Sequence, residues 1–249
     1  LPDQSVERMA EDAIAPLLSE LLSGPMGDGE RSRARFEQAR SAIRRAAVTI
    51  TSQLRAGRFT LYETEASFGY EGGMPPIVLS LANGREVMLR GRIDRIDRYD
   101  APDAVYLRVI DYKSAQQSLD AARTWWGLQL QLLLYLDVCT AAIENGKPAG
   151  AFYFYVADPL VESDTDLAPV VEAKLRDVFQ LRGITLTDVE ILNAMDSGET
   201  PCVLPPVYLK SGELRKNAKA LDMAQFTALL AHAREVAASL ADGLFGGRT

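Results

Sequence analysis

The sequence is poor in the residues that build disulfide frameworks and zinc sites. It has 249 residues but only two cysteines, Cys139 and Cys202, which stand far apart, and one histidine, His232. This scarcity argues against a secreted disulfide scaffold and a zinc site, and it is typical of a reducing compartment, so we expect a cytoplasmic location. No run reaches the roughly 18 uncharged apolar residues of a membrane helix, and no basic-then-apolar leader opens the chain, so we expect no membrane contact. Because the chain begins with Leu1, we expect a piece of a longer protein.

The sequence also lacks an overall positive charge. Its formal net charge of −7 argues against a protein that holds polyanions by bulk attraction. Between Arg31 and Arg58, however, eight arginines face one acid, Glu37, for a local sum of +7. This stretch is either a solvated helix face or a strip that contacts phosphates, and the sequence leaves both open. No G-x-x-x-x-G-K-[ST] loop occurs, so we do not expect this chain to bind ATP.

The hydrophobic periodicity changes along the chain from helical spacing to alternation and back. Helical spacing predicts helices over 4–23, 31–56, 123–145, 168–182 and 222–240. Alternation between turn residues predicts strands over 59–68, 76–81, 86–97 and 105–114 as a four-strand meander, with further strands over 151–158 and near 202–209. This order predicts an α/β fold with a mixed sheet flanked by helices. We divide it into a helical lead-in, 1–58, and a core, 59–249, within one domain.

Two acidic side chains and one lysine stand at matching places on the third and fourth predicted strands. Alternation sets Asp94 opposite the apolar stripe of 87–93, and it sets Asp111 and Lys113 on one face of the next strand. If the two strands pair, both carboxylates converge on one hard cation such as Mg²⁺, with the Tyr112 carbonyl as a further ligand.

The D-x-K tripeptide alone is weak, since an average chain of this length holds about one by accident. An E-x-K match at Glu172 and Lys174 lies in a predicted helix, where residues two apart point about 200° from one another, so it is rejected on geometry.

Three segments taken together resemble a known nuclease family. They are Gly91-Arg-Ile-Asp-Arg-Ile-Asp97, Val109-Ile-Asp-Tyr-Lys-Ser114 and Gly127-Leu-Gln-Leu-Gln-Leu-Leu-Leu-Tyr135. They resemble the motifs of the PD-(D/E)XK (RecB-like) superfamily, and in particular the C-terminal nuclease domain of AddB, the second subunit of bacterial AddAB helicase-nucleases. The resemblance covers nearly the whole chain and implies a restriction-endonuclease-like core.

The resemblance implies roles for individual residues. Asp94 and Asp111 would be metal ligands, and Lys113 would orient or activate the attacking water and stabilise the phosphate. Glu65 is carried over as a further catalytic candidate, although Glu63 shares its strand face. Gln131 and Tyr135 are helical neighbours on one face and would act with them, the alternative being an ordinary core helix with a buried tyrosine.

Arginines beside the motif have two interpretations. Arg92 shares a strand face with Asp94 and would contact DNA, whereas Arg95 and Arg98 are expected to form salt bridges with Asp94 and Asp97.

The sequence departs from the family pattern in two respects. Related domains carry a metal-binding histidine before the sheet, but His232 lies far downstream and is expected at the surface. Many AddB proteins also hold an iron–sulfur cluster with four cysteines that bracket this domain, and Cys139 and Cys202 match neither bracket. We expect a cluster, if any, only in the full-length subunit, or none in this lineage.

The resemblance and the residues together predict a metal-dependent deoxyribonuclease. It would use Mg²⁺, with Mn²⁺ as a substitute, to hydrolyse single-stranded DNA delivered by an AddA-type helicase-nuclease subunit during double-strand break processing for homologous recombination. One alternative is a decayed nuclease fold that serves as a DNA-binding or structural module. Another is a carboxylate-pair hydrolase such as a glycosidase, which needs neither the lysine nor Mg²⁺.

Overall fold

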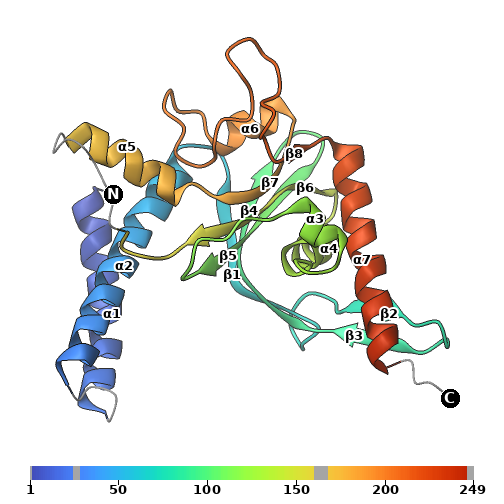
Figure 1. The fold of residues 1–249 in the computed structure, drawn as a ribbon, viewed down its shortest axis with the longest axis horizontal. Coiled ribbons are helices and arrows are strands. Elements are labelled where there is room, and N and C mark those ends of the chain that lie inside the picture. Colours follow the sequence, from blue (N-terminus) through green and yellow to red (C-terminus); the bar gives the residue numbers. More distant parts are fainter. Residues whose placement is uncertain (1, 25–28, 160–167, 246–249) are drawn as a thin grey trace.

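The fold is an α/β arrangement built on one mixed sheet (Figure 1). The structure, a computed structural model, describes residues 2–24, 29–159 and 168–245. The strands are β1 Thr60–Phe68, β2 Ile77–Ser80, β3 Glu86–Leu89, β4 Gly91–Asp100, β5 Val105–Lys113, β6 Gly146–Tyr155, β7 Arg182–Leu186 and β8 Ala220–Leu221. The helices are α1 Asp3–Ser23, α2 Glu30–Arg55, α3 Ala121–Trp125, α4 Gln131–Ala142, α5 Ala168–Phe179, α6 Val189–Met195 and α7 Met223–Phe245.

Within the described ranges, the main sheet has the strand order β1-β4-β5-β6-β7-β8. Strands β4 and β5 pair antiparallel, and β5 pairs with β6 in parallel after the crossover through α3 and α4. Helix α4 packs on β5 and β6, and α7 packs against α4 (Figure 1). Most residues of β5 and β6 are buried and the others are half-buried, as expected for central strands that are covered on both faces.

Two helices at the N-terminal end form a hairpin beside the sheet (Figure 1). Arginines of α2 pair with acids of α1: Arg40 with Glu11, and Arg44 with Glu7 at 3.5 Å. Arg45 Nε lies 2.7 Å from the carboxylate of Asp158, just past β6. These three arginines therefore join α2 to α1 and to the segment after β6, an arrangement that differs from both the solvated face and the phosphate strip that the sequence left open.

A buried charge cluster crosses the face of the sheet opposite Asp111. Asp97 accepts hydrogen bonds from Arg95 Nε and Nη2, both at 2.7 Å, and from Arg108 Nε at 2.8 Å. The three side chains are almost inaccessible to solvent. The expected salt bridge of Arg95 is therefore present, whereas Arg98 pairs with Asp100 instead.

The predicted four-strand meander is wrong in its details. The strand expected over 86–97 is two strands, because the extended structure is interrupted at Arg90. Strand β3 pairs with β2 in a separate two-stranded sheet, whereas β4 belongs to the main sheet. Gly91 is the first residue of β4 and lies close to the Phe68 ring, where a Cβ would be only 2.9 Å from the ring atoms. The hairpin of β2 and β3 lies against α7, and the backbone N–H of Ala82 in its turn donates to Asp242 Oδ1.

Two other predicted elements are corrected by the structure, and one unassigned stretch is a strand. The helix expected over 123–145 is interrupted between α3 and α4, where Gly127 has φ of 78°. The strand expected near 202–209 is only a single bridge, Tyr208 with Leu214, because Pro205 and Pro206 cannot donate to a ladder. The stretch 183–186, left unassigned by periodicity, belongs to β7.

Candidate active site

The two candidate carboxylates lie on one face of the sheet, at neighbouring places on β4 and β5. Arg95 pairs with Ile110 in the ladder, so the preceding Asp94 stands beside the following Asp111. Asp94 Oδ2 accepts a hydrogen bond of 2.8 Å from the backbone N–H of Tyr112. The expected alternation of these two strands thus brings both side chains to the same edge of the apolar core.

Lys113 completes this group from the same strand. Its Nζ lies 2.5 Å from Asp111 Oδ2, and its side chain is 29% exposed, whereas that of Asp111 is 4% exposed. Apart from this ion pair, Asp111 Oδ2 is a buried oxygen without a hydrogen-bond donor among the described residues. A buried carboxylate oxygen held only by a movable ammonium is suited to accept a second cation.

The electrostatics of the group follow from its burial. Burial raises the pKa of the Asp111 carboxyl above its ordinary value; Lys113 acts in the opposite direction, and the neighbouring charge of Asp94 adds repulsion. Burial alone would lower the pKa of Lys113, but the contact with Asp111 outweighs it, so the pKa is raised and the ammonium stays charged at neutral pH.

Helix α4 adds two polar side chains at its first turn. Gln131 Nε2 donates to Asp111 Oδ1 at 3.2 Å and to the hydroxyl oxygen of Tyr135 at 2.9 Å. The Tyr135 ring meets Phe68 of β1 edge-on, with ring centroids 5.7 Å apart. The structure therefore brings the helical pair Gln131 and Tyr135 to the carboxylates, in the arrangement that their four-residue spacing favours.

Two further candidates stand apart from this centre. Glu65 is exposed, has a φ of 52°, and forms a 3.5 Å ion pair with the equally exposed Arg92. Across the described residues, no group of three or more acidic, histidine or cysteine side chains is placed to hold a metal, so Glu65 does not complete a three-carboxylate site. His232 does not contact the carboxylates either, and its ring stacks on that of Trp125.

A polar cavity of about 530 Å³ opens beside the group of Asp94, Asp111 and Lys113. Its lining includes Lys113, Gln131 and Tyr153, together with Arg123 and Gln129. Tyr153 pairs with Asp111 across the parallel ladder, and Lys113 Nζ lies 5.7 Å from its ring centroid. Sequence reasoning missed Tyr153, because only the parallel pairing of β5 with β6 reveals it as a neighbour of Asp111.

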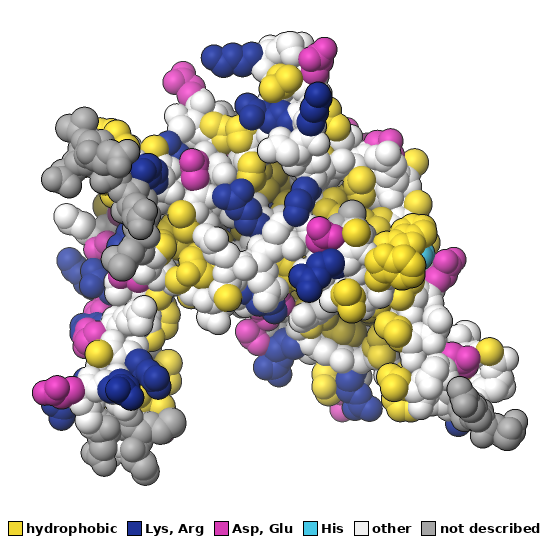
Figure 2. Space-filling view, in the orientation of Figure 1, with side chains coloured by type: hydrophobic (Ala, Val, Ile, Leu, Met, Phe, Trp, Pro, Cys, Tyr) yellow, Lys and Arg dark blue, Asp and Glu magenta, His cyan; other side chains and the backbone are white. Residues whose placement is uncertain are grey.

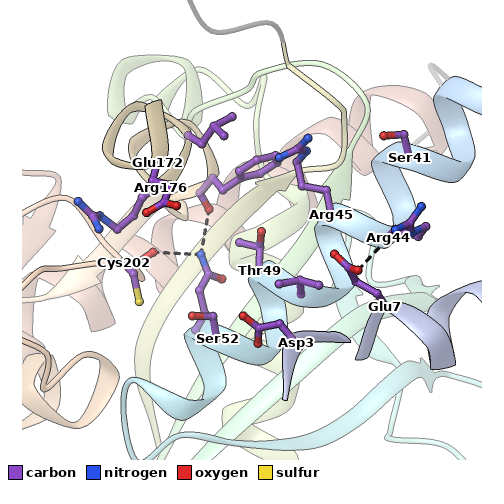
Figure 3. A pocket seen from close by; sticks show the side chains of 14 residues that line it. Asp3, Glu7, Ser41, Arg44, Arg45, Thr49, Ser52, Glu172, Arg176 and Cys202 are labelled. Carbon is purple, nitrogen blue, oxygen red and sulfur yellow. Dashed lines mark hydrogen bonds and ion pairs between the residues drawn. The ribbon is translucent and has the colours of Figure 1, made fainter. Parts of the chain in front are cut away.

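Another cavity, of about 440 Å³, lies between α1, α2 and α5 (Figure 3). Several of its lining side chains are engaged in internal contacts: Arg44 pairs with Glu7, and Gln53 Nε2 donates to the carbonyl oxygens of Phe179 and Cys202. None of the candidate catalytic residues lines it. This cavity belongs to the packing of the helices against the sheet.

The donor set fits Mg²⁺ better than a softer metal. Two carboxylates from adjacent strands and a backbone carbonyl are hard oxygen ligands, and Mg²⁺ keeps several waters rather than demanding an all-protein cage. The two cysteines are free, Cys139 buried and Cys202 half-buried, and neither belongs to the group.

Comparison with known sequences agrees with this geometry. Residues 3–248 match the sequence model of the PD-(D/E)XK nuclease superfamily. The chain belongs to this superfamily. Asp111, Tyr112 and Lys113 have the D-x-K pattern, and Asp94 is the acidic residue beside Asp111 on β4. None of the helices in the described ranges is long and apolar enough to cross a bilayer.

Curated relatives share one name, which describes the B subunit of an ATP-dependent helicase/deoxyribonuclease. The chain is 31% identical to that of Alkaliphilus metalliredigens over 255 residues, which cover 99% of this PD-(D/E)XK chain and 22% of the relative. It is 37% identical to that of Moorella thermoacetica over 246 residues (95% and 21%) and 31% identical to that of Geobacillus kaustophilus over 256 residues (96% and 22%). The chain thus spans about a fifth of the length of these relatives.

Proposed function

We propose that this domain is a Mg²⁺-dependent deoxyribonuclease that hydrolyses phosphodiester bonds of single-stranded DNA. The observation that carries the proposal is the convergence of Asp94 and Asp111 on one face of the sheet, with the Lys113 ammonium on Asp111 Oδ2. Superfamily membership supports the same chemistry.

Asp94, Asp111 and the carbonyl of Tyr112 would hold the metal ion, with water in the remaining positions, and Mn²⁺ could replace Mg²⁺. When bound, the ion would lower the pKa of a coordinated water and offset negative charge on the phosphate. The burial of Asp111 Oδ2, whose partner is the Lys113 ammonium, supports this assignment, because a metal ion would offset both the burial penalty of the carboxylate and its repulsion by Asp94.

Lys113 would orient or activate the attacking water and stabilise the charge on the phosphate. In the structure its contact with Asp111 raises its pKa, so the ammonium is charged and donates to that carboxylate. In the substrate complex the ammonium turns from Asp111 toward the phosphate, where it orients the attacking water and stabilises the charge of the pentacovalent phosphate.

The neighbouring polar residues position this pair. Gln131 fixes the orientation of the Asp111 carboxylate and is itself held by the Tyr135 hydroxyl. Arg92 is exposed on the same strand as Asp94 and is paired only loosely with Glu65, so it is free to turn to a DNA phosphate. When Arg92 turns to the DNA, the Glu65 carboxylate would lose its ion pair and be available as a further catalytic group.

The biological setting is inferred from the names of the relatives. The domain, a helical lead-in 1–58 with a core 59–249, would form part of an AddB-type subunit that works in the cytoplasm with an AddA-type subunit. ATP would be hydrolysed outside this chain, and the unwound strand would be delivered to the domain for double-strand break processing and homologous recombination. Any iron–sulfur cluster would belong to the full-length subunit.

Cleavage of end-labelled single-stranded DNA tests the proposal. We expect cleavage in Mg²⁺, none in EDTA, and loss of cleavage in Asp111→Asn and Asp94→Asn. Asp100→Asn is the matched control, because Asp100 is an exposed carboxylate at the far end of β4. A protein that binds the strand but does not cut it in Mg²⁺ or Mn²⁺ would establish the DNA-binding module instead, and cleavage that persists in EDTA would refute the metal.

A further inference from the structure

Both tryptophans of the chain lie in the short segment between β5 and α4. The side chain of Trp126 is 76% exposed, that of Trp125 is 57% exposed, and that of Leu128 is 69% exposed. Three large apolar side chains that face solvent within four residues form an unusual surface for a polar loop, and such patches mark binding sites. We call Trp125, Trp126 and Leu128 the tryptophan surface.

The loop beneath this surface is fixed by several independent contacts. Asp120 caps α3 by accepting from Arg123 N at 2.9 Å, and Gln129 closes the loop by accepting from Asp120 N at 2.8 Å and donating to Ser118 O at 3.3 Å. Gly127 fits against α7, where a Cβ would lie 2.9 Å from Val236. The backbone that carries the two tryptophans is therefore held in place by hydrogen bonds and by packing against α7.

Trp125 is additionally stacked on the only histidine of the chain. The ring centroids of Trp125 and His232 are 3.9 Å apart with an interplanar angle of 18°, and His232 Nε2 lies 3.3 Å from the Trp125 carbonyl oxygen. Figure 2 shows the cyan histidine at the edge of a group of hydrophobic side chains, with lysine and arginine side chains over the middle of the same face. An aromatic surface thus adjoins a basic one.

The tryptophan surface reaches the cavity beside Lys113 through Leu128. The 530 Å³ cavity that Lys113 and Gln131 line is also lined by Arg123 and Leu128. Arg123 is exposed, and its side chain has no ion-pair or hydrogen-bond partner within the part of the chain that the structure describes. A ligand with repeated negative charges and flat apolar groups matches this combination of cation and aromatic rings.

We propose that Trp126, next to Trp125 in the chain, is a base-stacking platform that holds single-stranded DNA near the cavity beside Lys113, with Arg123 on the DNA backbone. The inference rests on the proposed function and specifies its substrate. Unpaired bases offer free faces for stacking on aromatic side chains, whereas bases within a duplex are stacked on one another. The platform therefore selects single strands, and it tolerates any sequence because every base has a flat face.

Intrinsic fluorescence tests the platform directly, because both tryptophans report from it. With EDTA present to prevent cleavage, we expect short oligo(dT) to quench the emission on titration. An oligomer of the same length with abasic sites carries the same charge but no bases, so it should bind more weakly and leave the emission unchanged. Equal binding of the two oligomers, or no quenching by oligo(dT), would overturn the proposal.

Substitutions separate stacking from general affinity. Trp126→Ala should weaken oligo(dT) binding about 5- to 150-fold, the cost of one lost base–aromatic stack, and Trp126→Phe should restore most of it. Leu17→Ala is the control, because Leu17 is 61% exposed on α1, away from α3 (Figure 1). In Mg²⁺, Trp126→Ala should raise KM for single-stranded DNA with little change in kcat.

The outcomes distinguish this inference from the proposed function. If the chain cleaves single-stranded DNA and Trp126→Ala has the KM of the wild type, the platform is refuted and the nuclease assignment stands. If oligo(dT) quenches the tryptophans but no cleavage occurs in Mg²⁺ or Mn²⁺, the platform is supported and the nuclease assignment fails.

Discussion

The buried cluster of Arg95, Asp97 and Arg108 makes the sharpest prediction about stability. Asp97 is inaccessible to solvent and accepts three hydrogen bonds of 2.7–2.8 Å from the two guanidinium groups. Burial lowers the pKa of Arg108, while the charge of Asp97 opposes that shift. The Nη1 atoms of both arginines already lack hydrogen-bond partners among the described residues, so loss of the carboxylate would leave more of these buried donors unpaired.

Asp97→Asn removes the charge but keeps the shape. Breaking a buried ion pair on one side costs about 3–5 kcal/mol, because it leaves a charge uncompensated in the interior. For a domain of this size, about 2–4 °C is lost per kcal/mol, so the melting temperature should fall by roughly 6–20 °C. Thermal and urea unfolding followed by circular dichroism measure both quantities.

Asp100→Asn is a closely matched control on the same strand. The Arg98–Asp100 pair has the same two-residue spacing as Arg95–Asp97 but is exposed, and such pairs contribute only about 0–1 kcal/mol. Replacing the whole buried cluster by Met, Leu and Met should recover much of the lost stability, since no charge then remains buried. An Asp97→Asn protein within about 1 kcal/mol of the wild type would refute the reasoning.

Three further substitutions test other parts of the structure. Gln131→Leu removes the hydrogen bond to Asp111, so the Mg²⁺ concentration for half-maximal cleavage should rise about 10- to 100-fold, and an unchanged requirement would contradict a positioning role. Gly127→Ala should lower the free energy of unfolding by more than Gly72→Ala, measured in urea, because both glycines have φ of 78° but only Gly127 also lies against α7. The hydrogen bond from Ser41, with that from Arg45, lowers the pKa of Asp158 in the folded state, so its contribution of about 1 kcal/mol is present above the ordinary aspartate pKa and disappears as the pH falls through the lowered value. The stability difference between Asp158→Asn and wild type should therefore be full at pH 7 and vanish in strong acid, and a difference that persists in acid would contradict the ion pair.

The relative positions of the central residues could be predicted from strand alternation and helical spacing. A period of two sets Asp94 and Asp111 on matching faces once β4 and β5 pair, and a four-residue helical spacing sets Gln131 beside Tyr135. The contacts of Gln131 with both Asp111 and Tyr135 agree with that spacing.

Other features depend on long-range contacts that carry little local signal. The alternation of 86–97 continues unbroken through Arg90, so only the fit of Gly91 against Phe68 marks the division between two sheets. Gly127 was a visible sign that the helix over 123–145 is interrupted, but the strongly apolar run after it outweighed that sign. The place of Tyr153 beside Asp111 requires knowledge of a parallel pairing across a crossover.

An anomalous-difference map of crystals soaked in Mn²⁺ tests the central claim most directly. The account predicts a peak between the carboxylates of Asp94 and Asp111, with the Lys113 ammonium moved off Asp111 Oδ2, and no such peak in Asp111→Asn crystals. If the carboxylates are well ordered but no peak lies between them at saturating Mn²⁺, or if the peak lies elsewhere, the account is contradicted.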